Sequence, residues 1–175
     1  MDTLAQYYGL GLALAIGLLI GLERGWQERE VDATGRVAGI RTFALIGLLG
    51  GIWGALFPIV GGVALGFAAF AFAIGLAMFE WRESVRANTL SATDLIAGLL
   101  TFALGAYAVL GNKPAAAASG VTVAGLLALR HPLHAFLRRL PWAELRSGLL
   151  LLAMTVVLLP VLPDHTIDPW DTLNP

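Results

Sequence analysis

The chain has 175 residues, of which 58% are hydrophobic and only 13% are charged, and its mean hydropathy is +0.78. A soluble domain is roughly half apolar and about a quarter charged, so this composition indicates an integral membrane protein and excludes an ordinary soluble one. The absence of cysteine excludes disulfides and cysteine-ligated metals, and a net charge of −1 without a basic patch gives no indication of nucleic-acid binding.

Hydrophobic runs along the chain predict an all-α fold, a polytopic transmembrane helix bundle of about six spans. The predicted spans cover residues 4–22, 40–57, 60–79, 94–110, 115–129 and 147–162. The first run lacks the basic lead and the cleavage site of a signal peptide, so it is expected to remain as a span. Residues 1–162 form one predicted transmembrane domain, and residues 163–175 are a polar tail expected to lead into a second membrane domain.

The connections between these runs differ in charge. Residues 23–39 and 80–93 are polar, whereas Pro58 and the glycines at 61 and 62 make a short uncharged connection. A tight turn is predicted at Gly111–Pro114. Residues 130–146 mix basic residues, including His131 and His134, with large apolar ones, which is typical of an amphipathic segment lying at the membrane interface.

Basic residues predict the orientation of the spans. The three long connections, together with Arg41 at the start of the span that follows the first of them, hold ten of the eleven Lys and Arg, and Lys113 is the exception. With six spans these connections fall on one face, which the positive-inside rule places in the cytoplasm. Both termini are therefore expected outside.

Small residues recur on single helix faces at 100° per residue. Gly17-x-x-x-Gly21 shares a face with Arg24, and the span at 40–57 has a glycine stripe at 47, 50 and 54 with Arg41 well off it. In the span at 60–79, Glu80 continues a face of small residues that we expect to contact other helices. The face of the span at 94–110 holds Asp94, Ala97, Gly98, Thr101, Gly105, Ala108 and, beyond its end, Asn112.

That last face has two interpretations. It could line a polar path, with Asp94 at the cytoplasmic mouth, Thr101 in the middle and Asn112 at the outer mouth. It could instead be a helix–helix seam in which Thr101 bonds to backbone, and this interpretation is favoured because small stripes are the ordinary packing signal in membranes. For Asp94 itself, Ser91-Ala-Thr-Asp94 also matches a helix-capping pattern.

Charged residues lie at the predicted cytoplasmic boundary. Glu23, Arg24, Arg41, Thr42 and Glu80 are interpreted as a polar cluster, with Arg24 or Arg41 as the expected partner of Glu80. The alternative is that the arginines extend to the lipid headgroups, which explains arginines at helix ends but not the Glu-Arg pair directly after an apolar run. Nucleophile–base pairs, phosphate-binding loops and zinc helices have no match in the sequence, so no enzymatic activity, cofactor or metal is predicted.

The segment from 17 to 47 resembles the MgtC/SapB family of bacterial membrane proteins. The matching residues are Gly21-Leu-Glu23-Arg24 and Ala38-Gly39-Ile-Arg41-Thr42, separated here by a somewhat long loop. Asp94 and the segment 99–106 are similar to larger relatives in which such a half precedes a second membrane domain of unknown function. The resemblance implies a multi-pass protein of the bacterial inner membrane.

Two functions are compatible with these observations. The first is a transporter-like or channel-like protein for an ion or small solute, with the charge cluster as its polar site. The second is a regulator or scaffold that transports nothing and binds another membrane protein through its glycine faces. Expected partners are membrane lipids and either further copies of the chain or a second membrane domain.

Overall fold

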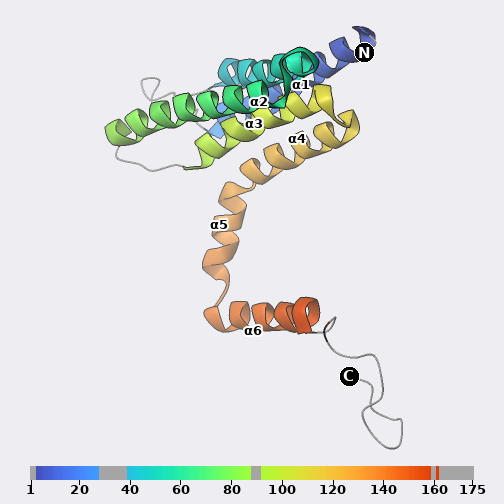
Figure 1. Cartoon of the computed structure of the whole chain (residues 1–175). Helices are drawn as coiled ribbons and strands as arrows, with labels where there is room; N and C mark the ends of the chain where they lie inside the picture. The colour runs from blue at the N-terminus through green and yellow to red at the C-terminus, as the bar shows by residue number, and fades with distance from the viewer. Residues whose placement is uncertain (1–2, 28–38, 88–91, 159–160, 162–175) are drawn as a thin grey trace, which may run out of the picture. The chain divides into compact units, whose positions relative to one another are not determined.

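The computed structural model describes residues 3–27, 39–87, 92–158 and 161, and the regular structure in them is helical, which confirms the predicted all-α class. The chain divides into two compact units, Met1–Leu129 and Arg130–Pro175. Figure 1 shows the helices, whose bounds are α1 Thr3–Gln27, α2 Ile40–Ala87, α3 Ala92–Leu110, α4 Lys113–Ala128, α5 Arg130–Arg139 and α6 Trp142–Ala153, followed by π-helical Met154–Leu158. Among the described residues, α1, Ile40–Arg82 of α2, and α3 are long and apolar enough to cross a membrane.

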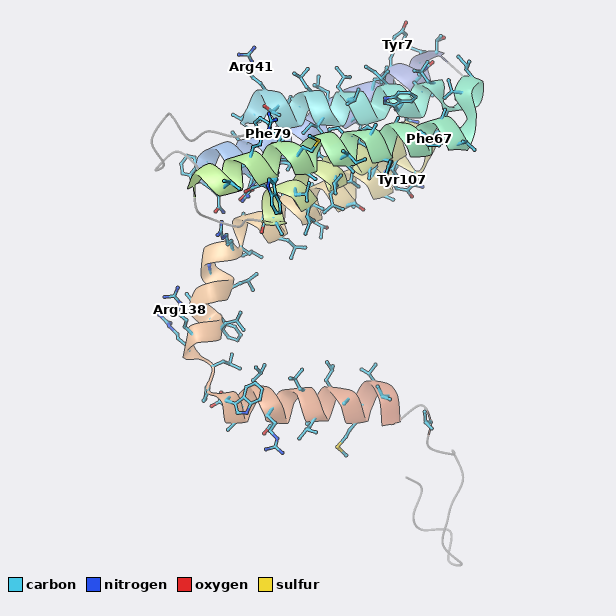
Figure 2. All side chains as sticks on the ribbon, turned by 60° about the vertical axis from the view of Figure 1, so that its left-hand side comes forward. Tyr7, Arg41, Phe67, Phe79, Tyr107 and Arg138 are labelled. Carbon is cyan, nitrogen blue, oxygen red and sulfur yellow. The ribbon has the colours of Figure 1, made fainter. Side chains whose placement is uncertain are left out.

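Helix α2 is a hairpin rather than a straight rod. Pro58 lies inside it, and Gly61 has φ 75° and ψ 173°, outside the helical region. Its first arm, residues 40–60, and its second arm, residues 62–87, run in opposite directions side by side (Figures 1 and 2). The predicted helical segments 40–57 and 60–79 are therefore both present, joined by a bend and not by a loop.

Gly61 is the residue that permits this bend. A positive φ with an extended ψ is essentially restricted to glycine, because a Cβ would collide with its own backbone. We expect Gly61→Ala to lower the free energy of unfolding by about 1–3 kcal/mol. A Cβ at Gly61 meets no other atom within 4 Å, so the effect would come from backbone conformation alone. The measurement is equilibrium unfolding in mixed micelles, with Gly62→Ala as the control; an equal loss in both would contradict the explanation.

The first arm of α2 lies between α1 and α3, in direct backbone contact with both. A Cβ on Gly47 would overlap the carbonyl oxygen of Ala13 in α1, and one on Gly50 would overlap that of Phe102 in α3. Glycine is needed at these positions because the helix axes come too close for any side chain. The predicted glycine stripe on the first arm is thus a packing seam, and Arg41 lies exposed away from it.

Contacts fix the directions of the helices in the first unit. α1 and the first arm are antiparallel, since Gly17 meets Phe43 while Gly21 meets Ile40. α3 is antiparallel to the second arm, because the rings of Phe72 and Phe102 stack with centroids 5.0 Å apart while Leu76 meets Gly98. Consequently the last turns of α1, the second arm and α4 lie at one end of the unit, together with the first turn of α3. We call this the charged end.

The surface of this unit is apolar, and its interior combines many small residues with a few large ones such as Ile20 and Phe43. Large side chains such as Ile59, Val63 and Phe67 are 82%, 76% and 70% exposed, and Figure 2 shows Phe67 and Phe79 on the outside of the second arm. Alanines at 13, 97, 108 and 116 are fully or almost fully buried. Large apolar side chains outside and small residues inside suit a bundle surrounded by lipid, because close packing of helix backbones contributes much of the contact between membrane helices.

Exposed aromatic residues mark both ends of the unit. Tyr7, Tyr8 and Tyr107 lie at the end opposite the charged end, and Trp26 and Trp81 lie at the charged end. Along α1, Tyr7 and Trp26 are separated by about 28 Å at 1.5 Å per residue, close to the roughly 30 Å of a bilayer core. Tyrosine and tryptophan favour the two membrane–water interfaces, so their positions support a membrane-spanning orientation for α1.

One predicted face is used only in part. The small residues of the second arm were expected to contact other helices; Ala69 and Ala73 are half-buried, but Gly66 and Ala77 are exposed and a Cβ on Gly66 would meet nothing within 4 Å. The second arm also contacts α3 through Phe72 and Leu76, which lie beside that face. Lipid accommodates small and large side chains alike, so a small stripe does not by itself compel contact.

The second unit contains the predicted interfacial segment and the predicted last span. α5 covers residues 130–139, and α6 begins at Trp142, earlier than the predicted start at 147. Described residues of the predicted span 147–162 form the rest of α6 and the π-helical turn, and most of their side chains are exposed. The tail at 163–175 lies outside the described residues, and the number of spans and the sidedness of the termini stay predictions.

Candidate functional site

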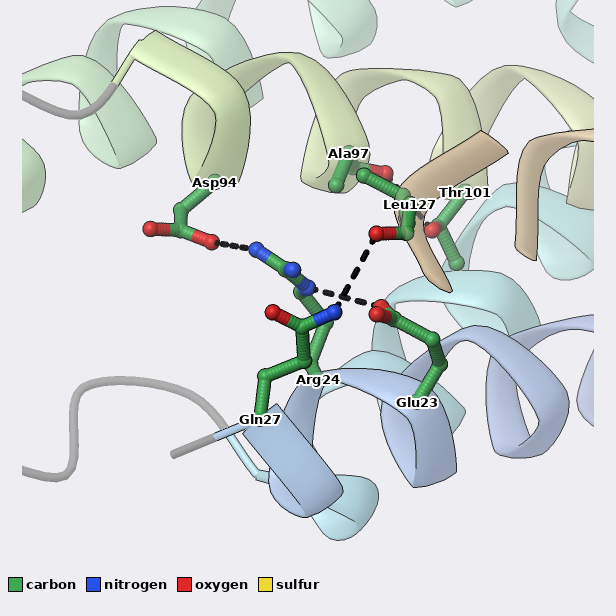
Figure 3. A network of polar contacts seen from close by, with 7 residues as sticks. All are labelled: Glu23, Arg24, Gln27, Asp94, Ala97, Thr101 and Leu127. Carbon is green, nitrogen blue, oxygen red and sulfur yellow. Dashed lines mark hydrogen bonds and ion pairs between the residues drawn. The ribbon is translucent and has the colours of Figure 1, made fainter. Parts of the chain in front are cut away.

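The centre of the candidate site is Arg24, in the last turn of α1. It lies on the same face as Gly17 and Gly21, whose close approach to α2 places this face inside the bundle, and only 3% of Arg24 is exposed. Its Nε donates to Glu23 Oε2 at 2.9 Å and its Nη1 donates to Asp94 Oδ1 at 2.5 Å (Figure 3). A buried guanidinium is tolerated only when it is paired and hydrogen-bonded, and both conditions hold here.

Asp94 reaches Arg24 from the first turn of α3. The two residues are 70 positions apart in sequence, and the antiparallel packing of α1 against α3 brings them together. A carboxylate in a first helical turn and a cation in a last turn each complement the helix dipole, so both helix ends favour this ion pair. The Asp94 side chain is 25% exposed and that of Glu23 is 10% exposed, so the triad lies at the edge of the bundle.

The triad of Glu23, Arg24 and Asp94 retains unused bonding capacity. Two carboxylates surround one guanidinium, which leaves one negative charge in excess when all three are ionised. Among the described residues, Glu23 Oε1 and Arg24 Nη2 are buried and find no hydrogen-bond partner. An unmet buried acceptor and an unmet buried donor are each costly. A small polar species could bond to either atom.

A neighbouring contact ties α4 to the same end of the unit. Gln27 Nε2 donates to the backbone carbonyl of Leu127 at 3.2 Å (Figure 3). This carbonyl lies in the last turn of α4, where the backbone carbonyls have no N–H partner four residues on within the helix. Residues from α1, α3 and α4 therefore meet around the triad, and α1 supplies the central residues.

The other residues of the predicted cluster are placed differently. Arg41 and Thr42 begin α2 and are exposed, and Figure 2 shows Arg41 extending away from the bundle. Glu80 is half-buried near the end of the second arm and has an interaction of its own. The structure thus joins Glu23 and Arg24 to Asp94, for which a separate polar path, a packing seam and a helix cap are the alternatives that the sequence offers. The functional role of Arg41, Thr42 and Glu80 stays a prediction.

A comparison with protein-family models supports the resemblance to the MgtC/SapB family that the sequence shows. The MgtC family model matches residues 10–136, which cover α1 from Leu10 onward, all of α2 to α4 and most of α5. The chain belongs to the MgtC family. No curated protein and no solved structure matches it. Membership of the MgtC family, together with the apolar helices, makes this a membrane protein, and the whole triad lies within the matched region.

In this MgtC family member, the residues of the predicted path have local structural partners. Thr101 is fully buried, and its hydroxyl donates to the carbonyl of Ala97 in its own helix at 2.7 Å. Asn112 is exposed and caps α4, accepting from the backbone N–H of Ala115 through Oδ1 at 2.9 Å. Ala97, Gly98, Gly105 and Ala108 are buried between helices, as a packing seam requires. These bonds agree with the favoured seam, although Thr101 bonds within its helix and not across the contact.

Sequence reasoning missed the pairing of Arg24 with Asp94 in this family member, although a signal was present. Both residues lie on the small-residue faces of their helices. Arg24 lies at the start of one polar connection and Asp94 directly follows the next, so both were expected at the same membrane boundary. Two opposite charges on two packing faces at one depth are candidates for a pair. The described residues contain no group of three or more His, Asp or Glu suited to holding a metal ion.

Proposed function

We propose that this MgtC family protein is a multi-pass protein of the bacterial inner membrane that is transporter-like or channel-like. It handles an ion or small polar solute at the triad of Glu23, Arg24 and Asp94. In the orientation given by the basic residues, the triad lies on the cytoplasmic side. The protein is not proposed to catalyse a reaction.

The observation that carries this proposal is the incomplete neutralisation of a buried charged site. A purely structural ion pair needs one carboxylate for one guanidinium, whereas Arg24 has two. The excess charge and the free donor and acceptor at Arg24 Nη2 and Glu23 Oε1 favour exchange of a small polar or charged species at this position. Charged groups placed this deep at a helix end are costly, which supports a functional reason for them.

The test is flux through the full-length protein reconstituted in liposomes, with internal dyes for Mg²⁺ and for H⁺ as probes. We expect Glu23→Gln to reduce flux at least about tenfold, the effect of roughly 1.4 kcal/mol on a rate-limiting step, because it removes the excess charge while keeping the shape. Arg41→Ala is the matched comparison at an exposed position, and it should change flux by less than about twofold. Equal flux in wild type and Glu23→Gln, with unfolding unchanged, would contradict the proposal.

A regulator or scaffold is the second candidate, and the packing favours a revised form of it. The glycine faces at Gly17 and Gly50, which we expected to bind a partner, are occupied by other helices of the same chain. Open glycines remain in several helices: a Cβ on Gly66 or Gly75 of the second arm, on Gly11 of α1 or on Gly125 of α4 would meet nothing within 4 Å. The second arm carries two of them, and it is the docking face proposed here for a partner membrane protein. Single cysteines at 66 and 75 test this by cross-linking in membranes, since the chain has no cysteine of its own.

A further inference from the structure

Helix α5 differs from every other described helix in its balance of charge. Its sequence, RHPLHAFLRR, contains three arginines and no acidic residue. At ten residues, or about 15 Å, it is too short to cross a bilayer. It directly follows the last helix of an apolar bundle and is followed by Trp142, which is 72% exposed. These features place a short cationic helix next to a membrane domain.

Beyond Arg130, which is the first residue of α5 and falls at the edge of the apolar arc, the large apolar and the basic side chains of α5 lie on two different sides. Leu133, Phe136 and Leu137 fall within an arc of about 100°, at 100° per residue. All three are exposed, at 45%, 61% and 57%. Arg138 and Arg139 lie on the remaining side, and Figure 2 shows Arg138 extending from the helix. Both arginines are exposed.

Charge decides which occupant the apolar face fits. A protein groove would bring acidic and basic groups together, whereas the absence of any acidic residue from α5 matches a uniformly negative surface. Anionic phospholipids provide such a surface, with phosphates that arginine binds through paired N–H donors. An apolar face opposite a basic face is the pattern of helices that lie in the headgroup region.

We propose that α5 is a docking element for anionic phospholipids, lying in the plane of the membrane interface. Leu133, Phe136 and Leu137 enter the boundary of the acyl chains, and Arg138 and Arg139 bind headgroup phosphates. This site is separate from the triad of Glu23, Arg24 and Asp94, and it operates whether or not the protein transports a solute. It makes the position of the second unit dependent on lipid charge.

The experiment uses the full chain in nanodiscs with one spin label on a cysteine introduced by Leu137→Cys. A second label at Ala135→Cys, on the other side of α5, is the matched control. Label depth is measured by relaxation with oxygen, which enters lipid, and with a nickel chelate, which stays in water. The discs contain either phosphatidylcholine alone or phosphatidylcholine with phosphatidylglycerol, and a second series carries Arg138→Gln and Arg139→Gln.

With phosphatidylglycerol, the label at 137 should contact oxygen and the label at 135 should contact the chelate. Removing both arginines should reduce the ratio of lipid-inserted to water-exposed label at 137 about 25-fold, taking about fivefold for each arginine near an anionic surface. High salt should also lower the ratio of lipid-inserted to water-exposed label at 137, because it screens the attraction between the arginines and the lipid phosphates. Equal depth in both lipids, or a label shielded from oxygen and chelate alike, as on a protein partner, would overturn the proposal.

Discussion

Replacing Arg24 with glutamine is expected to lower the free energy of unfolding by about 3 kcal/mol, the lower part of the range for breaking a buried ion pair. The substitution leaves Glu23 and Asp94 facing each other without a cation, in a position where their side chains are only 10% and 25% exposed. The partial exposure of Asp94 lets it turn toward water, which is why the lower part of the range applies. The measurement is equilibrium unfolding in mixed micelles, followed by helical circular dichroism.

Two further variants separate charge from geometry. Arg24→Lys keeps the charge but cannot reproduce two bonds that leave from Nε and Nη1, so its loss should be intermediate. The double variant Arg24→Gln/Asp94→Asn should lose less than the sum of its single variants, because the residues act as a pair. Arg41→Gln, at an exposed position, is the control. A loss below about 1 kcal/mol for Arg24→Gln, typical of surface pairs, would refute the structural role of the triad.

Substituting Gly50 with alanine is expected to lower the free energy of unfolding by about 1–3 kcal/mol, the usual effect of adding a methyl group to a filled interior. The new Cβ would overlap the carbonyl oxygen of Phe102, which is backbone and cannot rotate away. The first arm of α2 and α3 would have to move apart, which would also weaken the contact between Gly47 and Gly105. Alanine has a higher helix propensity than glycine, so propensity alone would make the variant more stable, and a loss of stability would have to come from the overlap with Phe102.

Gly66→Ala is the matched control for this prediction. The substitution is identical and the helix is the same, but Gly66 lies on the open side of the second arm with no neighbour within 4 Å. Alanine there should leave stability unchanged or raise it by up to about 1 kcal/mol, since helix propensity acts alone. Thermal unfolding of the two variants side by side gives the comparison. Similar losses at Gly50 and Gly66 would argue against the close contact between the first arm and α3.

Much of the fold was predictable because hydrophobic length and helical periodicity are local properties. The runs at 4–22, 94–110 and 115–129 correspond to α1, α3 and α4, although α4 begins at Lys113, inside the tight turn predicted over Gly111–Pro114. A short uncharged connection was expected at Pro58 and the glycines at 61 and 62, where the structure has the bend of α2. Helical hydrogen bonding continues close to Gly61, because a single residue with positive φ is enough to reverse the chain. The face of the second arm was predicted only in part: Ala69 and Ala73 are half-buried, whereas Gly66 and Ala77 are exposed, since lipid does not force small residues into contacts.

The candidate site was predictable in part. The face of Arg24 followed from its spacing to Gly17 and Gly21, and its burial agrees with that. Its partner did not follow, because spacing gives the direction of a side chain and not the helix that lies opposite. Sequence placed Glu80 and Asp94 at the same depth, and only the packing of α1 against α3 selects Asp94 for the bond to Arg24.

The reversal at Gly61 has a consequence for how the protein enters the membrane. As a straight rod, the 43 residues Ile40–Arg82 of α2 would measure about 65 Å, twice the thickness of a bilayer core. No polar segment at the bend needs to be carried across the lipid, since Pro58, Ile59 and Val60 precede Gly61 directly. We therefore expect the two arms to insert as one unit during synthesis. A protease added from the far side of the membrane should find no exposed loop to cut between them.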